Sequence, residues 1–185
     1  MFFRKSRVEP LPVTMSAVRM GERLLQVGVD EPSVVSTLAA KVGLSGSSVC
    51  AVPDQTDATR IQSEAARAGV LMDLRVAPLE ALPVEDNAFD LVVVHSAEHL
   101  PGKLGETGLL AAAREWHRSL RIGGRVVTIE HYRSTGFRAL LPGTSEPGPS
   151  GSSRMVGLLE QAGFRPVRQL AEREGYVFCE GLKTG

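Results

Sequence analysis

The residues best suited to acid–base chemistry are histidines that close apolar runs of the kind that form buried strands. His95 and His131 each close such a run, and Glu98, His99 and Glu130 lie beside them in the sequence. Ligands of open α/β sheets bind beyond the carboxyl ends of the strands, so these side chains are expected to share one edge. Imidazole titrates near neutral pH, which suits proton transfer. We therefore assign candidate catalytic roles to His95 and His99.

The same histidines also match a metal-binding pattern. The string His95-Ser96-Ala97-Glu98-His99 has the H-x-x-E-H spacing of some zinc peptidases. That spacing works only when both histidines share one helical face, whereas His95 is expected to finish a strand, and nothing identifies a further ligand. The sequence therefore predicts no metal site. The alternative is that these side chains have no chemical role and form a ring of polar groups around an unused pocket.

Size and charge limit the classes of function. The chain has 185 residues, 43% of them hydrophobic, with 21 basic and 21 acidic side chains. These values fit one globular domain and give no general attraction to nucleic acid or anionic membranes. Neither a signal-peptide core nor an apolar run of membrane-spanning length is present, and Cys50 and Cys179 fit reduced core thiols. We expect a cytoplasmic protein whose partner is a small molecule or a protein; its oligomeric state stays open.

Strand and helix patterns alternate along the chain, which predicts an α/β domain with a parallel sheet. The expected strands are 23–28, 49–52, 73–76, 89–94 and 125–129, followed by a hairpin of 167–171 and 176–181. The expected helices are 32–42, 57–68, 109–120 and 153–162. The side chain of Asp30 is expected to cap the first of these helices.

The chain is expected to hold one domain, residues 21–185, behind a short N-terminal segment, residues 1–20. Glycine, proline and serine dominate residues 142–152, which predicts a flexible surface loop. A plain connector is the favoured interpretation of this loop. The alternative is a lid that closes on a ligand.

Several strings resemble the class I S-adenosylmethionine-dependent methyltransferases. Residues 80–92, EALPVEDNAFDLV, are similar to the family's loop and fourth strand, which usually read EALPFPDNSFDLV. Residues 120–127, LRIGGRVV, resemble its LKPGGRVV string, and residues 158–164 resemble its last helix. The resemblance implies a Rossmann-like three-layer sandwich. Its seven-stranded sheet would have the order 3-2-1-4-5-7-6, with only the seventh strand antiparallel.

The loop that holds the cofactor in that family is degenerate in this chain. In the family, the first strand ends in an acidic-x-Gly-x-Gly-x-Gly loop, whereas this chain reads Gln26-Val27-Gly28-Val29-Asp30-Glu31-Pro32. Asp30 places a side chain and a negative charge at the second glycine, and Pro32 removes an N–H from the helix start. Of the three glycines, only Gly28 is kept. The loop is therefore expected to bind a carboxylate poorly.

Two further contacts of the family are replaced. In the family, an acidic residue binds the ribose and an aspartate binds the adenine. Pro53 and Pro78 stand at these two positions, although a bulge in the chain would bring Asp54 to the ribose position. If each lost hydrogen bond to a charged group is worth about 1.5–3 kcal/mol, two losses weaken binding by about 10²–10⁴-fold. The residues assigned to the cofactor edge are Gln26, Gly28, Asp30, Asp54, Leu79, Glu80 and His95.

Two functions follow from this pattern. The favoured one is a methyltransferase-like domain with an eroded S-adenosylmethionine site, which carries out little or no methyl transfer and acts as a binding, assembly or regulatory module. The alternative is an active methyltransferase with an atypical cofactor pocket, in which His95 or His99 orients a small-molecule acceptor. Methyl transfer depends mainly on proximity and alignment, so it requires no particular base. Binding of S-adenosylmethionine, which we expect to be weak or absent, distinguishes the two.

Overall fold

A computed structural model describes residues 9–132 and 151–185 of the chain, with side chains from residue 154 in the second range. Its centre is one seven-stranded sheet with the order β3-β2-β1-β4-β5-β7-β6, as the sequence predicts. The strands are β1 (Arg23–Val27), β2 (Ser47–Val52), β3 (Asp73–Val76), β4 (Phe89–Val94), β5 (Leu120–His131), β6 (Val167–Arg173) and β7 (Tyr176–Leu182). Strands β1 to β5 pair in parallel, and β7 is antiparallel to both of its neighbours.

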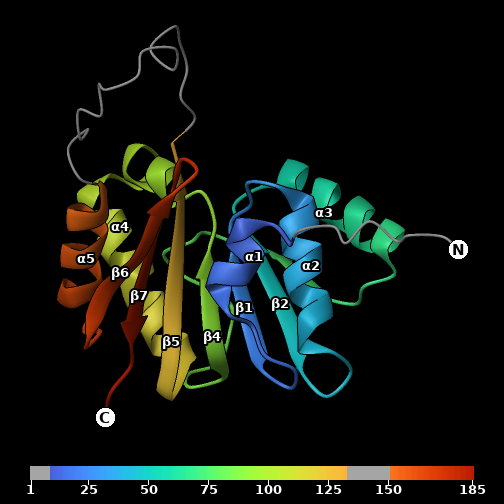
Figure 1. Ribbon diagram of the computed structural model, residues 1–185, viewed down its shortest axis with the longest axis horizontal. Helices are drawn as coiled ribbons and strands as arrows, with labels where there is room; N and C mark the ends of the chain where they lie inside the picture. Colours follow the sequence, from blue (N-terminus) through green and yellow to red (C-terminus); the bar gives the residue numbers. More distant parts are fainter. Residues whose placement is uncertain (1–8, 133–150) are drawn as a thin grey trace, which may run out of the picture.

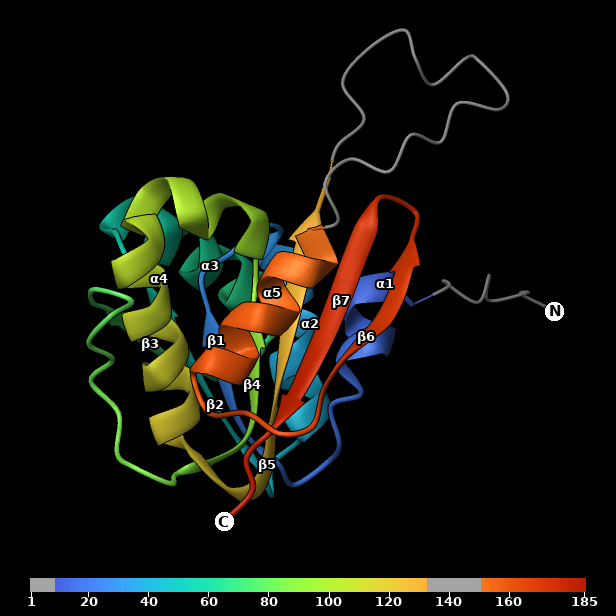
Figure 2. The ribbon, with the colours of Figure 1, turned by 90° about the vertical axis from the view of Figure 1, so that its left-hand side faces the viewer.

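Helices cover both faces of this sheet, which makes the fold a Rossmann-like sandwich of three layers. The helices are α1 (Leu11–Ser16), α2 (Pro32–Val42), α3 (Gln55–Ala68), η1 (Ala97–His99), α4 (Leu100–Ser119) and α5 (Gly151–Gln161). Helices α1 and α2 lie in front of the sheet in Figure 1, whereas α4 and α5 pack on the opposite face (Figure 2). Because both faces are covered, the central strand β4 is buried along nearly its whole length.

The helix predicted for residues 109–120 is longer than the sequence indicated. Helix α4 begins at Leu100, and Gly105 interrupts it with a φ of +65°. Pro101, Gly102 and Gly105 have low helix propensity, which concealed the first two turns from a periodicity argument. The structure therefore adds helical turns directly after the end of β4.

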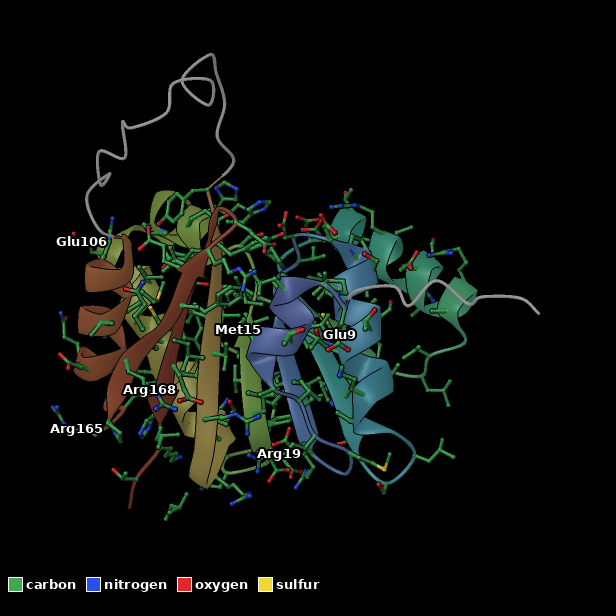
Figure 3. All side chains as sticks on the ribbon, in the orientation of Figure 1. Glu9, Met15, Arg19, Glu106, Arg165 and Arg168 are labelled. Carbon is green, nitrogen blue, oxygen red and sulfur yellow. The ribbon has the colours of Figure 1, made fainter. Side chains whose placement is uncertain are left out.

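Helix α1 lies inside the segment that the sequence left without structure. Its Val13 is buried against the core between α2 and the sheet. Just before the helix lies Glu9, which is labelled in Figure 3. Its carboxylate pairs with Nζ of Lys41 on α2 at 2.8 Å. These contacts fix the short helix to the front face of the sheet.

The predicted cap of α2 is wrong. The residue that caps this helix is Glu31, whose side chain makes no capping hydrogen bond, and Pro32 occupies the first turn. The carboxylate of Asp30 instead lies 3.2 Å from Nδ1 of His131 on β5. The side chain that the sequence assigned to the helix thus contacts His131 at the end of β5 instead.

Cys50 and Cys179 are buried free thiols, as expected. Residues 142–150 of the predicted loop lie outside the described residues, and α5 starts at Gly151. Along the described residues, no helix combines the length and apolar character that crossing a bilayer requires.

Candidate functional site

The candidate site lies where the carboxyl ends of β1, β4 and β5 meet, at the upper edge of the sheet in Figure 1. The chain runs from β1 outward to β2 and β3, and then returns to place β4 on the other side of β1. Such a switch point is where open α/β sheets bind their ligands. The main chain is tightly joined here, because the N–H of His95 donates to the carbonyl of Val27 at 2.9 Å.

Direct contacts join the loops that follow these strands. The hydroxyl of Ser96, after β4, donates to the carbonyl of Val29, after β1, at 3.2 Å. Asp30 Oδ2 lies 3.2 Å from His131 Nδ1 at the end of β5, with the two side chains 26% and 17% exposed. The loop after β1 is therefore fastened to the ends of both β4 and β5.

His95 lies beneath this edge rather than on it. Its Nε2 is 3.0 Å from Oε1 of Gln26, and both side chains are buried. The amide nitrogen of Gln26 donates to the carbonyl of Val35 at 3.0 Å and lies 3.4 Å from the hydroxyl of Ser48. Burial lowers the pKa of His95 to about 4, although the nearby Asp30 carboxylate acts in the opposite direction. His95 is thus a neutral, hydrogen-bonded group inside the fold.

The remaining polar side chains form a chain of contacts above the sheet edge. Glu98, in η1, accepts the backbone N–H of His131 at 3.0 Å. Its other oxygen is 3.3 Å from Nε2 of His99, a side chain that is 67% exposed. The ring of His131 stacks on Tyr176 of β7 with the centroids 4.0 Å apart. The structure thus brings together His99, His131 and Glu98, as the sequence predicts, but turns His95 away from them.

Glu130 is a buried carboxylate at the same edge. Tyr132 donates its hydroxyl to Oε2 of Glu130 at 2.5 Å, whereas Oε1 has no hydrogen-bond partner among the described residues. Burial, followed by the charge of Glu98, raises the pKa of Glu130 against the lowering effect of the tyrosine. Burial and the Glu130 carboxylate also raise the pKa of Tyr132. This pair can hold a proton more firmly than an exposed carboxylate does.

Comparison with known proteins identifies the family. A family model described as a methyltransferase domain matches residues 25–128, more than half of the chain. The chain belongs to this methyltransferase family. No curated protein matches the chain significantly. Membership implies S-adenosylmethionine as the cofactor, and the resemblance found in the sequence is confirmed.

Solved structures share the fold of this methyltransferase domain at low identity. An S-adenosylmethionine-dependent methyltransferase from Aquifex aeolicus is 17% identical, with a TM-score of 0.72 over 93% of this chain and 87% of that one. A TehB-like methyltransferase from Corynebacterium glutamicum is 14% identical, with a TM-score of 0.64 over 93% and 85%. A chain from the Haloferax volcanii complex of the Trm112 methyltransferase activator is 13% identical, with a TM-score of 0.65 over 94% and 87%. At these identities the likeness concerns the fold alone.

The other residues that the sequence assigns to the cofactor edge contact different parts of this methyltransferase domain. Gly28 has a φ of +72°, and a Cβ there would lie 3.2 Å from the carbonyl oxygen of His95, so a side chain would be strained. Asp54 caps α3, with Oδ1 accepting the N–H of Asp57 at 3.0 Å. Leu79 is buried in the core. The carboxylate of Glu80 lies beside α4, where a Cβ on Gly108 would be 3.3 Å from it.

The described side chains of this edge do not have the arrangement of a metal site. Within the described part of the chain, no three histidine, cysteine, aspartate or glutamate side chains are grouped as metal ligands. In the H-x-x-E-H string, His95 follows β4, and Ala97–His99 form a short 3₁₀ turn. The two histidines of the string do not share an α-helical face.

Three residues at this edge escaped the sequence argument. Ser96 has a left-handed backbone with a φ of +50°, which is uncommon for a residue other than glycine and is frequent at functional sites. Tyr132 lies two residues beyond Glu130, and Tyr176 stands opposite His131 in the register of β5 and β7. The alternation of side chains along β5 could have indicated Tyr132. The position of Tyr176 opposite His131 depends on the register in which the terminal hairpin pairs with β5, which the sequence does not indicate.

Proposed function

We propose that this methyltransferase domain has an eroded S-adenosylmethionine site, carries out little or no methyl transfer, and acts as a binding, assembly or regulatory module. The observation that supports the proposal is that two side-chain contacts hold the loop after β1 in place. Ser96 bonds to Val29, and Asp30 pairs with His131, across the switch point where a cofactor would lie.

The fastened loop leaves the methionine part of the cofactor without its usual partners. The family's second glycine is replaced by Asp30, whose carboxylate would face the carboxylate of S-adenosylmethionine. Displacing it would break the pair with His131, which is largely shielded from water. Pro32 in the first turn of α2 also removes one N–H that could otherwise bind an anion.

The ribose contact is weakened for a different reason. Asp54 is the acidic residue nearest the end of β2, and its Oδ1 already accepts the N–H of Asp57 at the start of α3. One oxygen would have to serve both ribose hydroxyls while the other keeps the cap. At the adenine position, Pro78 offers no side-chain acceptor. The residues present therefore fit S-adenosylmethionine poorly.

A role in assembly has some support from the comparisons. One structural neighbour was solved as part of a complex with a methyltransferase activator protein. A domain of this fold can therefore be a component of a protein complex. We propose a protein or a small molecule as the partner of this chain.

A thermal-shift titration with S-adenosylmethionine and S-adenosylhomocysteine tests the proposal. A ligand at 100 times its Kd stabilises a fold by about 2.7 kcal/mol, which is a shift of about 5–10 °C for a domain of this size. An active methyltransferase of the same fold, measured in parallel, is the positive control. We expect no saturable shift at millimolar ligand for this chain.

The variant Asp54→Asn makes the titration more informative than Asp54→Ala. Asparagine caps helices about as well as aspartate, so it removes the charge while it keeps α3 intact. A saturable shift of the native chain would overturn the proposal in favour of an active enzyme that acts on a small-molecule acceptor. If Asp54→Asn abolished that shift, Asp54 would be the ribose ligand after all.

A further inference from the structure

Strand β3 forms one edge of the sheet, and its outer side carries no paired strand among the described residues. The N–H of Ala77 donates to the carbonyl of Val52 on β2. Successive residues of a strand point their N–H and C=O groups to opposite sides, so Asp73 and Arg75 also face β2. The backbone groups of Leu74 and its even-numbered neighbours therefore point outward. This edge can accept another strand.

The side chains of β3 divide into an apolar face and a charged face. Met72, Leu74 and Val76 lie on the α3 side, where they line a groove of about 530 Å³ together with Ala58 and Ile61 of α3. Val76 is 47% exposed, although it is a large apolar side chain. The apolar face thus extends from the core out to the edge of the sheet.

The opposite face of β3 carries one charge of each sign. Asp73 and Arg75 lie there, and Arg75 Nη2 is 2.5 Å from Asp73 Oδ2 along the same strand. Arg75 Nη1 also donates to the carbonyl of Pro83, and both charged side chains remain partly exposed. Along the strand an acidic residue, an apolar residue and a basic residue follow one another. Two copies of this strand that run in opposite directions can therefore place each acidic residue opposite a basic one.

We propose that β3 pairs in antiparallel fashion with β3 of a second copy of this chain, with the twofold axis passing beside Leu74. In this register Leu74 lies opposite Leu74 of the second copy, and Asp73 lies opposite Arg75 of the second copy. Met72 lies opposite Val76 of the second copy. A twofold axis normal to the sheet keeps the two apolar faces on the same side, so the two grooves meet.

The backbone and the charges select this register over its neighbours. Outward N–H and C=O groups belong to Leu74 and its even-numbered neighbours, so only registers that oppose even residues to even residues form the ladder. Moving the second strand by two residues in one direction places Asp73 opposite Asp73 of the second copy. The same movement in the other direction places Arg75 opposite Arg75. Like charges directly opposite are unfavourable in a sheet, whereas opposite charges stabilise it.

Sedimentation analysis of the native chain from about 1 to 500 µM, without any cofactor, tests the proposal. We expect a concentration-dependent dimer. Leu74→Lys brings two like charges together at the axis and should weaken the dimer by at least about tenfold. The matched control is Leu44→Lys, which changes a fully exposed leucine in the turn after α2 and should leave the dimer unchanged. A monomeric native chain, or a dimer that Leu74→Lys leaves intact, would overturn the proposal.

Charge reversal tests the register itself and uses exposed or partly exposed positions, where folding is less sensitive. Asp73→Arg and Arg75→Asp should each weaken the dimer by about tenfold, and the double variant should recover most of that loss. A double variant no better than the single ones would overturn the register. Circular dichroism establishes that each variant is folded. Cofactor binding plays no part in this measurement, so its outcome is separable from that of the thermal-shift titration.

Discussion

The Nε2 atom of His95 lies 3.0 Å from the Oε1 atom of Gln26, and both side chains are buried. The amide nitrogen of Gln26 donates to the carbonyl of Val35, so the amide oxygen is the atom that faces the imidazole. His95 must therefore carry its proton on Nε2. The pair joins β1 to β4 directly below the switch point.

We predict that His95 makes the protein less stable in mild acid. Burial lowers the pKa of His95 to about 4, below the ordinary value of 6.5 that it regains on unfolding. Between these values the unfolded chain binds a proton that the folded chain does not. The contribution of His95 to stability is therefore complete above pH 6.5 and is lost as the pH falls to about 4. The slope from this group should reach about 1.4 kcal/mol per pH unit.

Urea unfolding of the native chain and of His95→Gln across this pH range measures that slope. The variant should lose the contribution of His95, whereas the exposed His99→Gln should keep it. Nitrogen chemical shifts of the imidazole at pH 6 should also show a neutral ring with its proton on Nε2, because pH 6 lies above the pKa of about 4. An unchanged slope in His95→Gln would contradict the prediction.

The pair of Asp30 and His131 should contribute a measurable coupling. Its side chains are 26% and 17% exposed, so solvent screens the attraction only in part. We expect a double-mutant cycle with Asp30→Asn and His131→Gln to give about 0.5–1 kcal/mol. The corresponding cycle on Glu98 and His99 should give less, because the His99 side chain is 67% exposed. Equal coupling in the two cycles would argue against a role for the pair in fastening the loop.

Asp54 should behave as a helix cap in stability measurements. Its carboxylate accepts the N–H of Asp57 at the start of α3. We expect Asp54→Ala to lower the free energy of unfolding by about 1 kcal/mol and Asp54→Asn to change it by only a few tenths. Chemical denaturation of the three proteins provides the measurement. If asparagine were as costly as alanine, the charge rather than the cap would be what stabilises the fold.

Strain at Ser96 predicts an unusual order among its variants. Ser96→Ala and Ser96→Gly both remove the hydrogen bond to Val29, but only glycine adopts a φ of +50° without cost. The glycine variant should therefore be more stable than the alanine variant by about 1 kcal/mol. In a helix or strand the opposite order would be expected. A more stable alanine variant would show that the backbone here is not strained.

The sheet could be predicted from the sequence because its signals are local. The apolar run Phe89–Val94 and the strings around it are continuous in the chain. Each of them indicates one element and the element that follows or precedes it in the sequence. The early turns of α4 were missed because Pro101 and Gly105 interrupt the helical pattern, and α1 was missed because its six residues are too few for a periodicity argument.

The candidate site was harder to predict because its contacts join distant parts of the chain. The sequence places His99 and His131 at this edge, since that depends only on where each strand ends, whereas His95 lies beneath it. The partners were not foreseen: Asp30 and His131 are 101 positions apart, and Gln26 and His95 are 69 apart. Their pairing depends on the register between strands and on the side-chain rotamers, which no short motif records.

The bonds from Ser96 to Val29 and from Asp30 to His131 have a consequence for how this edge opens. No short loop connects the ends of β1, β4 and β5, so beyond the main-chain pairing of the strands these side-chain bonds, with that of Glu98 to the N–H of His131, join the three ends. With the bonds in place, opening one end releases the contacts of the next. The backbone amides of all three ends should therefore exchange with deuterium as one cooperative unit, at a common opening free energy.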